Sequence, residues 1–403
     1  MPRPEASASP RLRAGAVLVL ALGAVAAAVT ILSASDIPAG TYRDNDFSQY
    51  YAGARAVAMG RSPYGETFWA VLREIGSKAL FAKPYATVPE AGLTVAYPLW
   101  VFVLLAPMGL LPLALAASAF LMAQLAGIVA ALVAIARRLL SGVSGGALVF
   151  AVVAAAFQPL WLILVGGNLA GIIAAAFIGG VAAALSGRPR LAGGLLGLCL
   201  LKPHVVAIAV LALLLGLDPR ARRRALASFA VVAIVLIAIS FASDPSWIAP
   251  WWRNLTALQS TSGSNATGWT IDRAVDAPRW TSPVAVAVVL GSFVVWVRVR
   301  RPAPATMIAA ATPVSIFAAP HAWSYDAVPL LLSVAVLIAI FGRIGGRAGA
   351  LGLAAIGALA IVGPWAAYAL AFRRGGEEWT AVVILAFFPL VVLADSLQRR
   401  MAT

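Results

Sequence analysis

The sequence contains few charged residues for its length. Of its 403 residues, only 11% are charged and 62% are hydrophobic, whereas a soluble domain carries about 25% charged residues. A soluble protein needs polar side chains to cover its surface, and this chain has too few of them. Its surface must therefore face lipid, and we expect an integral membrane protein.

Cysteine and histidine are almost absent. The one cysteine, Cys199, excludes an intrachain disulfide, and two histidines argue against a His/Cys metal site. The chain has no P-loop, no dinucleotide-binding fingerprint and no Ser-His-Asp signature. Its net charge of +15 comes from arginines in short clusters between apolar runs, as in the cytoplasmic loops of membrane proteins. We therefore expect a lipid bilayer as partner, no nucleic acid, no cofactor and no bound metal, with metal dependence left open.

Long apolar runs make up most of the chain. A spanning helix needs about 20 residues, so we expect an all-α polytopic membrane protein of about 11–13 transmembrane helices, some of them half-helices or tilted. Pro98, Pro107 and Pro112 interrupt the run 97–136, which we count as one net crossing. The chain is predicted to form one domain, residues 1–403, built from the runs 14–33, 97–136, 144–165, 168–185, 190–201, 203–217, 225–242, 281–297, 305–319, 325–341, 349–371 and 379–396.

The arginines predict the orientation of the chain. The basic N-terminus resembles a signal peptide, but the many later apolar runs favour a retained first span and a cytoplasmic N-terminus. Six arginine clusters then fall on the cytoplasmic side, as does the C-terminus: Arg137/Arg138, Arg188/Arg190, Arg220/Arg222/Arg223/Arg224, Arg298/Arg300/Arg301, Arg343/Arg347 and Arg399/Arg400. The long polar segments 34–96 and 243–280 become outer loops. Because the chain is rich in arginine and alanine, we expect a bacterial plasma membrane.

Acidic residues concentrate on the predicted outer face. Twelve of the 15 acidic residues and both histidines lie there. The twelve are Asp36, Asp44, Asp46, Glu66, Glu74, Glu90, Asp244, Asp272, Asp276, Asp326, Glu377 and Glu378. Because the other face carries mostly arginine, any catalytic chemistry is predicted to be extracytoplasmic.

Asp46 lies in the first outer loop, shortly before a tyrosine pair. One interpretation makes it the N-cap of a helix that includes residues 52–58. That interpretation does not explain Tyr50 and Tyr51, so a functional role for these residues stays equally open. Asp44, two residues earlier, is an alternative carboxylate for the same role.

Lys202 is the only lysine after Lys83, and it stands between two short apolar runs, followed by Pro203 and His204. A lysine in this position can snorkel to the membrane interface. It can equally be a cation at the outer mouth of a cavity, ready for a phosphate, because half-helices that meet at a polar turn often build a site in membrane proteins. Both interpretations stay open.

His321 stands near Trp323, Tyr325 and Asp326 at another predicted outer turn. These residue types are typical of an interfacial aromatic belt. They also suit a proton-bearing group that binds or protonates an anion. We favour the functional interpretation, because the chain has only two histidines and both fall at such turns.

The loop 243–280 combines tryptophans with arginines, among them Arg253. Aromatic rings and arginines suit the binding of sugar rings and lipid phosphates. They also suit an amphipathic helix that lies on the membrane surface, which is the better interpretation for any single tryptophan.

Several short motifs follow one another in a set order. They are Asp46-Phe47, Tyr50-Tyr51, Gly60-Arg61-Ser62-Pro63-Tyr64, Tyr97-Pro98, Gly193-Gly194 with Lys202-Pro203, and Pro320-His321-Ala322-Trp323. This ordered set resembles glycosyltransferase family 87, whose members are membrane enzymes with the GT-C fold. The chain departs from the family at two points. Leu99 stands where a second proline is usual, and Gly166-Gly167-Asn168 replaces a Gly-Gln-x-Asn segment.

The resemblance implies a GT-C-like bundle with a long first outer loop. It also implies an inverting enzyme that moves a sugar, by default mannose, from a polyprenyl-phosphate donor to a glycan or glycolipid acceptor. A carboxylate of the first outer loop serves such enzymes as the base, and Asp46 matches it. Cations stabilise the departing lipid phosphate, and the candidates are Lys202, His321 and Arg253. Further candidates for substrate binding are Tyr50, Tyr51 and His204, with Asp44, Asp326 and Asn168 as secondary ones.

Two other functions compete with this one. A transporter or flippase of lipid-linked sugars would place ionisable groups deep in its spans, whereas the charges here lie mainly at predicted span ends. A non-catalytic membrane protein of envelope assembly needs no aspartate, lysine and histidine on one face. The glycosyltransferase is therefore the favoured prediction.

Overall fold

The computed structural model describes residues 46–75, 96–261, 265–374 and 376–402, and this part of the chain is mostly helical, without a β-strand. Lipid offers no hydrogen-bond partners, so an apolar chain that crosses it must pair its backbone internally, as a helix does. Local signals set the helix starts. Proline occupies the first turn of several helices, as at Pro219 and Pro304. Asp218 caps the helix at Pro219 by accepting from the N–H groups of Arg220 and Ala221.

Six helices in the described part are long and apolar enough to cross a membrane. They are Leu113–Leu139 (α7), Pro219–Ser243 (α13), Thr281–Arg300 (α16), Ser324–Ile344 (η4 and α18), Gly346–Ala371 (α19, η5 and most of α20) and Glu378–Met401 (α21). The pair Gly146–Ala156 (α8) and Gln158–Gly166 (α9), bent by 49°, makes a seventh if it is one span. The predicted polytopic all-α class is confirmed.

Shorter apolar helices occupy most of the remaining predicted runs. They are Leu99–Gly109 (α6), Ala170–Leu185 (α10), Pro189–Leu201 (α11 and η1), Ala207–Gly216 (α12) and Pro304–Ala318 (α17). Every predicted run from 97–136 onward is therefore helical. The run 97–136 divides at residues 110–112 into α6 and α7. The first predicted run, 14–33, lies outside the described residues.

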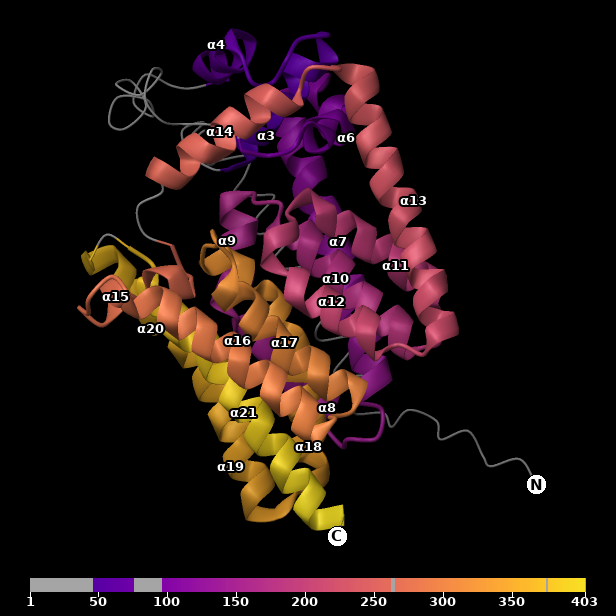
Figure 1. Cartoon of the computed structure of the whole chain (residues 1–403), viewed down its shortest axis with the longest axis vertical. Coiled ribbons are helices and arrows are strands. Elements are labelled where there is room, and N and C mark those ends of the chain that lie inside the picture. Colours follow the sequence, from indigo (N-terminus) through magenta and orange to yellow (C-terminus); the bar gives the residue numbers. More distant parts are fainter. Residues whose placement is uncertain (1–45, 76–95, 262–264, 375, 403) are drawn as a thin grey trace.

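Segments from the two predicted outer loops meet at one end of the molecule (Figure 1). We call α3, α4, α6 and α14 the cap, where α3 spans Asp46–Ala58, α4 spans Glu66–Ile75 and α14 spans Ile248–Thr261. The indole of Trp251 on α14 donates to the carbonyl of Ala96, which precedes α6. Trp100 on α6 donates to the carbonyl of Leu200, so the cap is tied to the bundle below it.

Glycine permits the close packing of α3 on α6. A Cβ atom at Gly53 would lie 2.3 Å from the Phe102 ring, and one at Gly109 would lie 2.5 Å from the backbone nitrogen of Arg55. The second clash is with backbone, which cannot rotate out of the way. The position of α3, and with it that of Asp46, therefore depends on Gly109.

We expect Gly109→Ala to lower the free energy of unfolding by about 1–3 kcal/mol, because the added methyl group pushes α3 away from α6. Thermal unfolding in detergent measures the effect. Gly166→Ala is the matched control, since this helical residue also ends its helix and an added Cβ there would meet nothing within 4 Å. Equal melting temperatures for the two variants would contradict the argument.

The bundle is built around α18. In the span Ser324–Ile344, 83% of the most apolar window is buried, against 17% for Pro219–Ser243 at the periphery. The peripheral helix α13 packs on α11 through Gly193, where a Cβ would lie 1.9 Å from the carbonyl oxygen of Ala225. In Figure 1, α13 extends from the bundle to the cap.

The break between α8 and α9 frees two backbone carbonyls, and indoles on the outer surface of the bundle satisfy them. The indole of Trp161 donates to the carbonyl of Ala155 at 2.7 Å, and the indole of Trp365 donates to that of Ala156 at 3.1 Å. An unpaired carbonyl in this environment would cost several kcal/mol. The two tryptophans therefore stabilise the bend.

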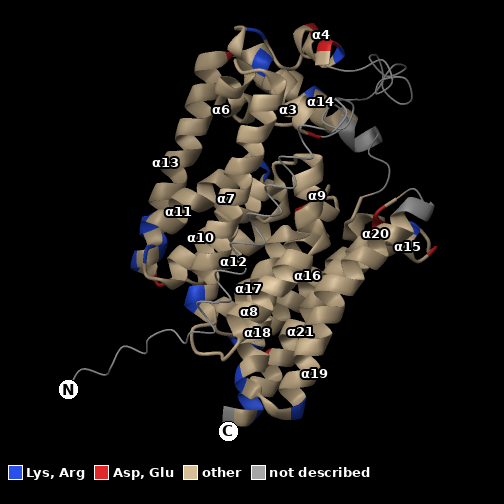
Figure 2. Ribbon diagram, turned by 180° about the vertical axis from the view of Figure 1, so that it is seen from behind, with Lys and Arg blue, Asp and Glu red and all other residues tan. Residues whose placement is uncertain are grey.

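Basic residues gather at the end of the bundle away from the cap (Figure 2). Arginines lie in the last turns of α7, α16, α18 and α21. Those of α13 lie at its start. The predicted clusters thus share one end of the molecule. Which side of the membrane that end faces stays a prediction.

Candidate active site

Asp46 and Tyr50 bring the start of α3 onto the turn between α9 and α10. The two residues are one helical turn apart and share a face. Asp46 Oδ2 accepts a hydrogen bond from Asn168 Nδ2 at 2.6 Å, and the Tyr50 hydroxyl accepts from the N–H of Leu169 at 3.4 Å. The turn is possible because Gly167 adopts φ +60°, a conformation that favours glycine.

Tyrosines extend this contact to the segments that precede α4 and α6. The hydroxyls of Tyr50 and Tyr97 are hydrogen-bonded at 2.7 Å. The Tyr64 hydroxyl donates to the carbonyl of Tyr97 at 2.8 Å. Three of the short motifs found in the sequence, those containing Tyr50, Tyr64 and Tyr97, therefore meet in one network.

Lys202 lies at the break between α11 and α12, as the sequence predicted. Its ammonium group contacts both carboxylate oxygens of Asp326, at 2.6 and 2.7 Å. The two side chains are only 3% and 0% exposed. The Lys202 Nζ also lies 5.0 Å from the centre of the Tyr325 ring. Lys202 is therefore a buried, paired cation and not an interfacial lysine.

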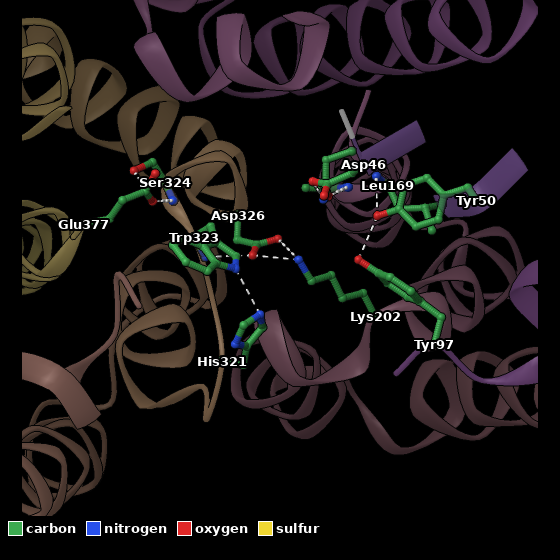
Figure 3. Close-up of polar contacts among 12 residues, drawn as sticks. Asp46, Tyr50, Tyr97, Leu169, Lys202, His321, Trp323, Ser324, Asp326 and Glu377 are labelled. Atoms are coloured by element: carbon green, nitrogen blue, oxygen red, sulfur yellow. Dashed lines mark hydrogen bonds and ion pairs between the residues drawn. The ribbon is translucent and has the colours of Figure 1, made fainter. Parts of the chain in front are cut away.

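Asp326 is fixed by its own short helix, η4 (Ser324–Leu330). Its Oδ2 also accepts from the N–H of Trp323 at 3.0 Å, in the manner of the third residue of a capping box. Ser324, the residue after Trp323, donates both its N–H and its hydroxyl to Glu377 Oε2 at 2.7 Å. The turn that carries Asp326 is therefore held from the segment before α21 (Figure 3).

The two histidines lie close together beside this ion pair. Their ring centroids are 6.5 Å apart, and the Trp323 indole donates to His321 Nε2 at 3.0 Å. Burial and the nearby Lys202 charge lower the pKa of His204 and of His321 to about 4. Both imidazoles are therefore neutral at pH 7.

Burial also governs the groups around Asp46. Burial raises the pKa of Asp46 above its usual 3.8, and the charge of Asp326 acts in the same direction. The hydrogen bond from Asn168 and the charge of Lys202 oppose this rise. Burial likewise raises the pKa of Tyr97, so its hydroxyl stays protonated.

The structure brings together most of the predicted residues. Asp46, Asn168 and Tyr50 form one group, and Lys202, Asp326, His204 and His321 form the other; Figure 3 places the labelled members of both around one region.

Three predicted residues are not part of this assembly. The Tyr51 hydroxyl donates to the carbonyl of Leu111 and accepts from Arg55, so it packs α3 against the chain between α6 and α7. Arg253 is exposed on α14. Asp44 lies outside the described residues.

Residues not predicted as part of the site also belong to it. Tyr97 and Trp323 occurred in the motifs but had no assigned role, and Glu377 was noted only as an outer acid. The sequence could have indicated Trp323, because this residue follows His321 by two positions and its indole can therefore reach the imidazole. In the described part of the chain, no three or more His, Cys, Asp or Glu residues are grouped as metal ligands.

Residues 95–324 match the model of glycosyltransferase family 87, which is more than half of the chain. The chain belongs to glycosyltransferase family 87. No curated protein and no solved structure matches it. The segment matched to glycosyltransferase family 87 contains Tyr97, Asn168, Lys202 and both histidines, whereas Asp46 precedes it. With its spanning helices, the chain is thus a membrane glycosyltransferase, and the favoured functional class is confirmed at this level.

Proposed function

We propose that the chain transfers a sugar, with mannose as the first candidate, from a polyprenyl-phosphate donor to a glycan or glycolipid on the extracytoplasmic face of the membrane. The observation that carries the proposal is the half-buried Asp46, whose carboxylate is held by Asn168 and lies within the electrostatic reach of Lys202. A base and a cation are the two groups that such a transfer requires.

The proposed reaction is a single displacement. Asp46 takes the proton from the acceptor hydroxyl while that oxygen bonds to the anomeric carbon. The bond between this carbon and the phosphate oxygen breaks, and the phosphate leaves with the electron pair. Because the acceptor attacks from the face opposite the leaving group, the anomeric configuration inverts. The products are the glycosylated acceptor, polyprenyl phosphate and one proton, which Asp46 then releases.

Lys202 is suited to the donor phosphate. A lysine ammonium has three N–H donors, and the two oxygens of Asp326 occupy two of them. None of the residues that the structure describes is seen to accept from the third, which can therefore donate to a phosphate oxygen without loss of the ion pair. A buried ammonium stabilises the growing negative charge of the leaving group more strongly than one in water would.

We expect the rate of sugar transfer to fall as the pH is lowered. The fall should occur at a higher pH than it would with an aspartate of ordinary pKa. The base must be deprotonated, so activity is present above the raised pKa of Asp46 and is lost as the pH falls through it. Both histidines, with a pKa of about 4, should add no change near neutrality. A profile of kcat/KM between about pH 4 and 8 tests this. A rate that declines between pH 7 and 6 by histidine titration would contradict it.

The assay that tests the function uses purified protein in nanodiscs, labelled polyprenyl-phosphate mannose and a lipid extract of the host. Transfer of label by the wild type, and none by Asp46→Asn, supports the proposal. A panel of other polyprenyl-phosphate sugars, and a nucleotide sugar, is run in parallel. Transfer from the nucleotide sugar alone would overturn the proposed donor class.

A further inference from the structure

The Pro-His-x-Trp motif places an indole against an imidazole. Trp323 Nε1 lies 3.0 Å from His321 Nε2, and the two rings are nearly perpendicular, with an interplanar angle of 83°. An indole N–H can only donate a hydrogen bond. His321 Nε2 must therefore offer a lone pair, and the proton of the neutral ring must be on Nδ1.

We propose that Trp323 is a positioning residue that locks His321 in the uncharged Nδ1–H tautomer, so that His321 gives the site a hydrogen-bond donor for a substrate oxygen and neither a proton nor a positive charge. The role of this donor in transfer rests on the function proposed above. The tautomer itself can be tested without any substrate.

The surroundings of His321 favour a neutral ring. The ammonium of Lys202 opposes protonation, and the carboxylate of Asp326 favours it but is already paired with that ammonium. The facing imidazole of His204 is also neutral. The hydrogen bond that Trp323 donates also favours the neutral ring, because it stabilises only the form with a free lone pair on Nε2.

The other ring nitrogen of His321 has a free hydrogen-bonding position. His321 Nδ1 is buried and has no hydrogen-bond partner among the residues that the structure describes. A buried N–H without a partner is unfavourable, and a substrate oxygen that accepts from it removes this cost. Charge stabilisation then belongs to Lys202 and orientation of the substrate to His321.

Nuclear magnetic resonance of 15N-histidine tests the tautomer directly. The chain has two histidines, so His204→Gln assigns the spectrum of protein purified without a histidine tag. We expect His321 to show a protonated Nδ1 and an unprotonated Nε2 between about pH 5.5 and 8. Trp323→Phe should shift His321 toward the Nε2–H tautomer and raise its pKa. Trp269→Phe, which removes an indole bonded to the Ala318 carbonyl, should leave His321 unchanged. An imidazolium or an Nε2–H ring in the wild type would overturn the proposal.

Substitution of His321 tests the role. An asparagine amide nitrogen occupies nearly the position of Nδ1, whereas a glutamine amide nitrogen reaches that of Nε2. His321→Asn should therefore transfer label about tenfold faster than His321→Gln, the value of one hydrogen bond. Equal losses in both variants would overturn the donor role. If no variant and no wild type transfers label, the proposed function fails, while the spectrum still decides the tautomer.

Discussion

Asp46→Asn is expected to lower kcat by about 10²- to 10⁴-fold, the usual contribution of a general base. Asparagine has nearly the same shape, and its carbonyl oxygen can still accept the hydrogen bond that Asn168 donates to Asp46. What it cannot do is take a proton. The initial rate of label transfer measures the loss, and an unchanged melting temperature shows that the site is still assembled.

Two variants make this result specific. Glu66→Gln is the control, because Glu66 is a surface carboxylate of the cap that pairs with Arg73, and this variant should retain full activity. Asp44→Asn tests the alternative base. If Asp44→Asn abolishes transfer and Asp46→Asn does not, the base is Asp44, and the carboxylate bound to Asn168 has another role.

Lys202→Met is expected to destabilise the protein by about 3–5 kcal/mol and to abolish transfer. Methionine keeps most of the volume of the lysine but leaves the buried carboxylate of Asp326 without its counter-ion. Removal of one partner from a buried pair is far more costly than removal of both. Thermal unfolding in detergent and the transfer assay are measured on the same preparation.

The double variant Lys202→Met/Asp326→Asn separates stability from catalysis. Asparagine can still accept from the N–H of Trp323, and neither charge of the ion pair remains, so most of the lost stability should return while activity does not. Arg73→Met, which breaks the exposed pair with Glu66, is the control and should cost no more than about 1 kcal/mol. Full activity in the double variant would exclude Lys202 as the group that stabilises the leaving phosphate.

Apolar run length predicted most of the fold. Each run from 97–136 onward became a helix or a pair of helices, because lipid leaves an apolar chain no other way to satisfy its backbone. The turn at Lys202 was predicted from a charged residue between two short runs. Run length could not show that α6 would leave the bundle and join the cap, since that depends on the packing of Gly53 and Gly109 against distant residues.

The site was only partly predictable for a similar reason. Residue types identified Asp46, Lys202 and His321 as candidates, but they could not pair Lys202 with Asp326, 124 residues away. The sequence could have distinguished Tyr50 from Tyr51. Asp46 precedes Tyr50 by four residues, so in a helix Tyr50 shares its face and Tyr51 does not. Sequence spacing thus resolves contacts within a helix, whereas contacts between helices require the packed structure.

The Ser324–Glu377 contact has a consequence for biosynthesis. Asp46 lies near the start of the described chain, yet its surroundings include Asn168, Lys202 and Asp326, and the turn that holds Asp326 is secured by Glu377. A ribosome supplies these groups in order, at about 5–20 residues per second. The contacts of the site are therefore complete only when residue 377, just before α21, has been made, and a nascent chain released earlier lacks the carboxylate that holds the Asp326 turn.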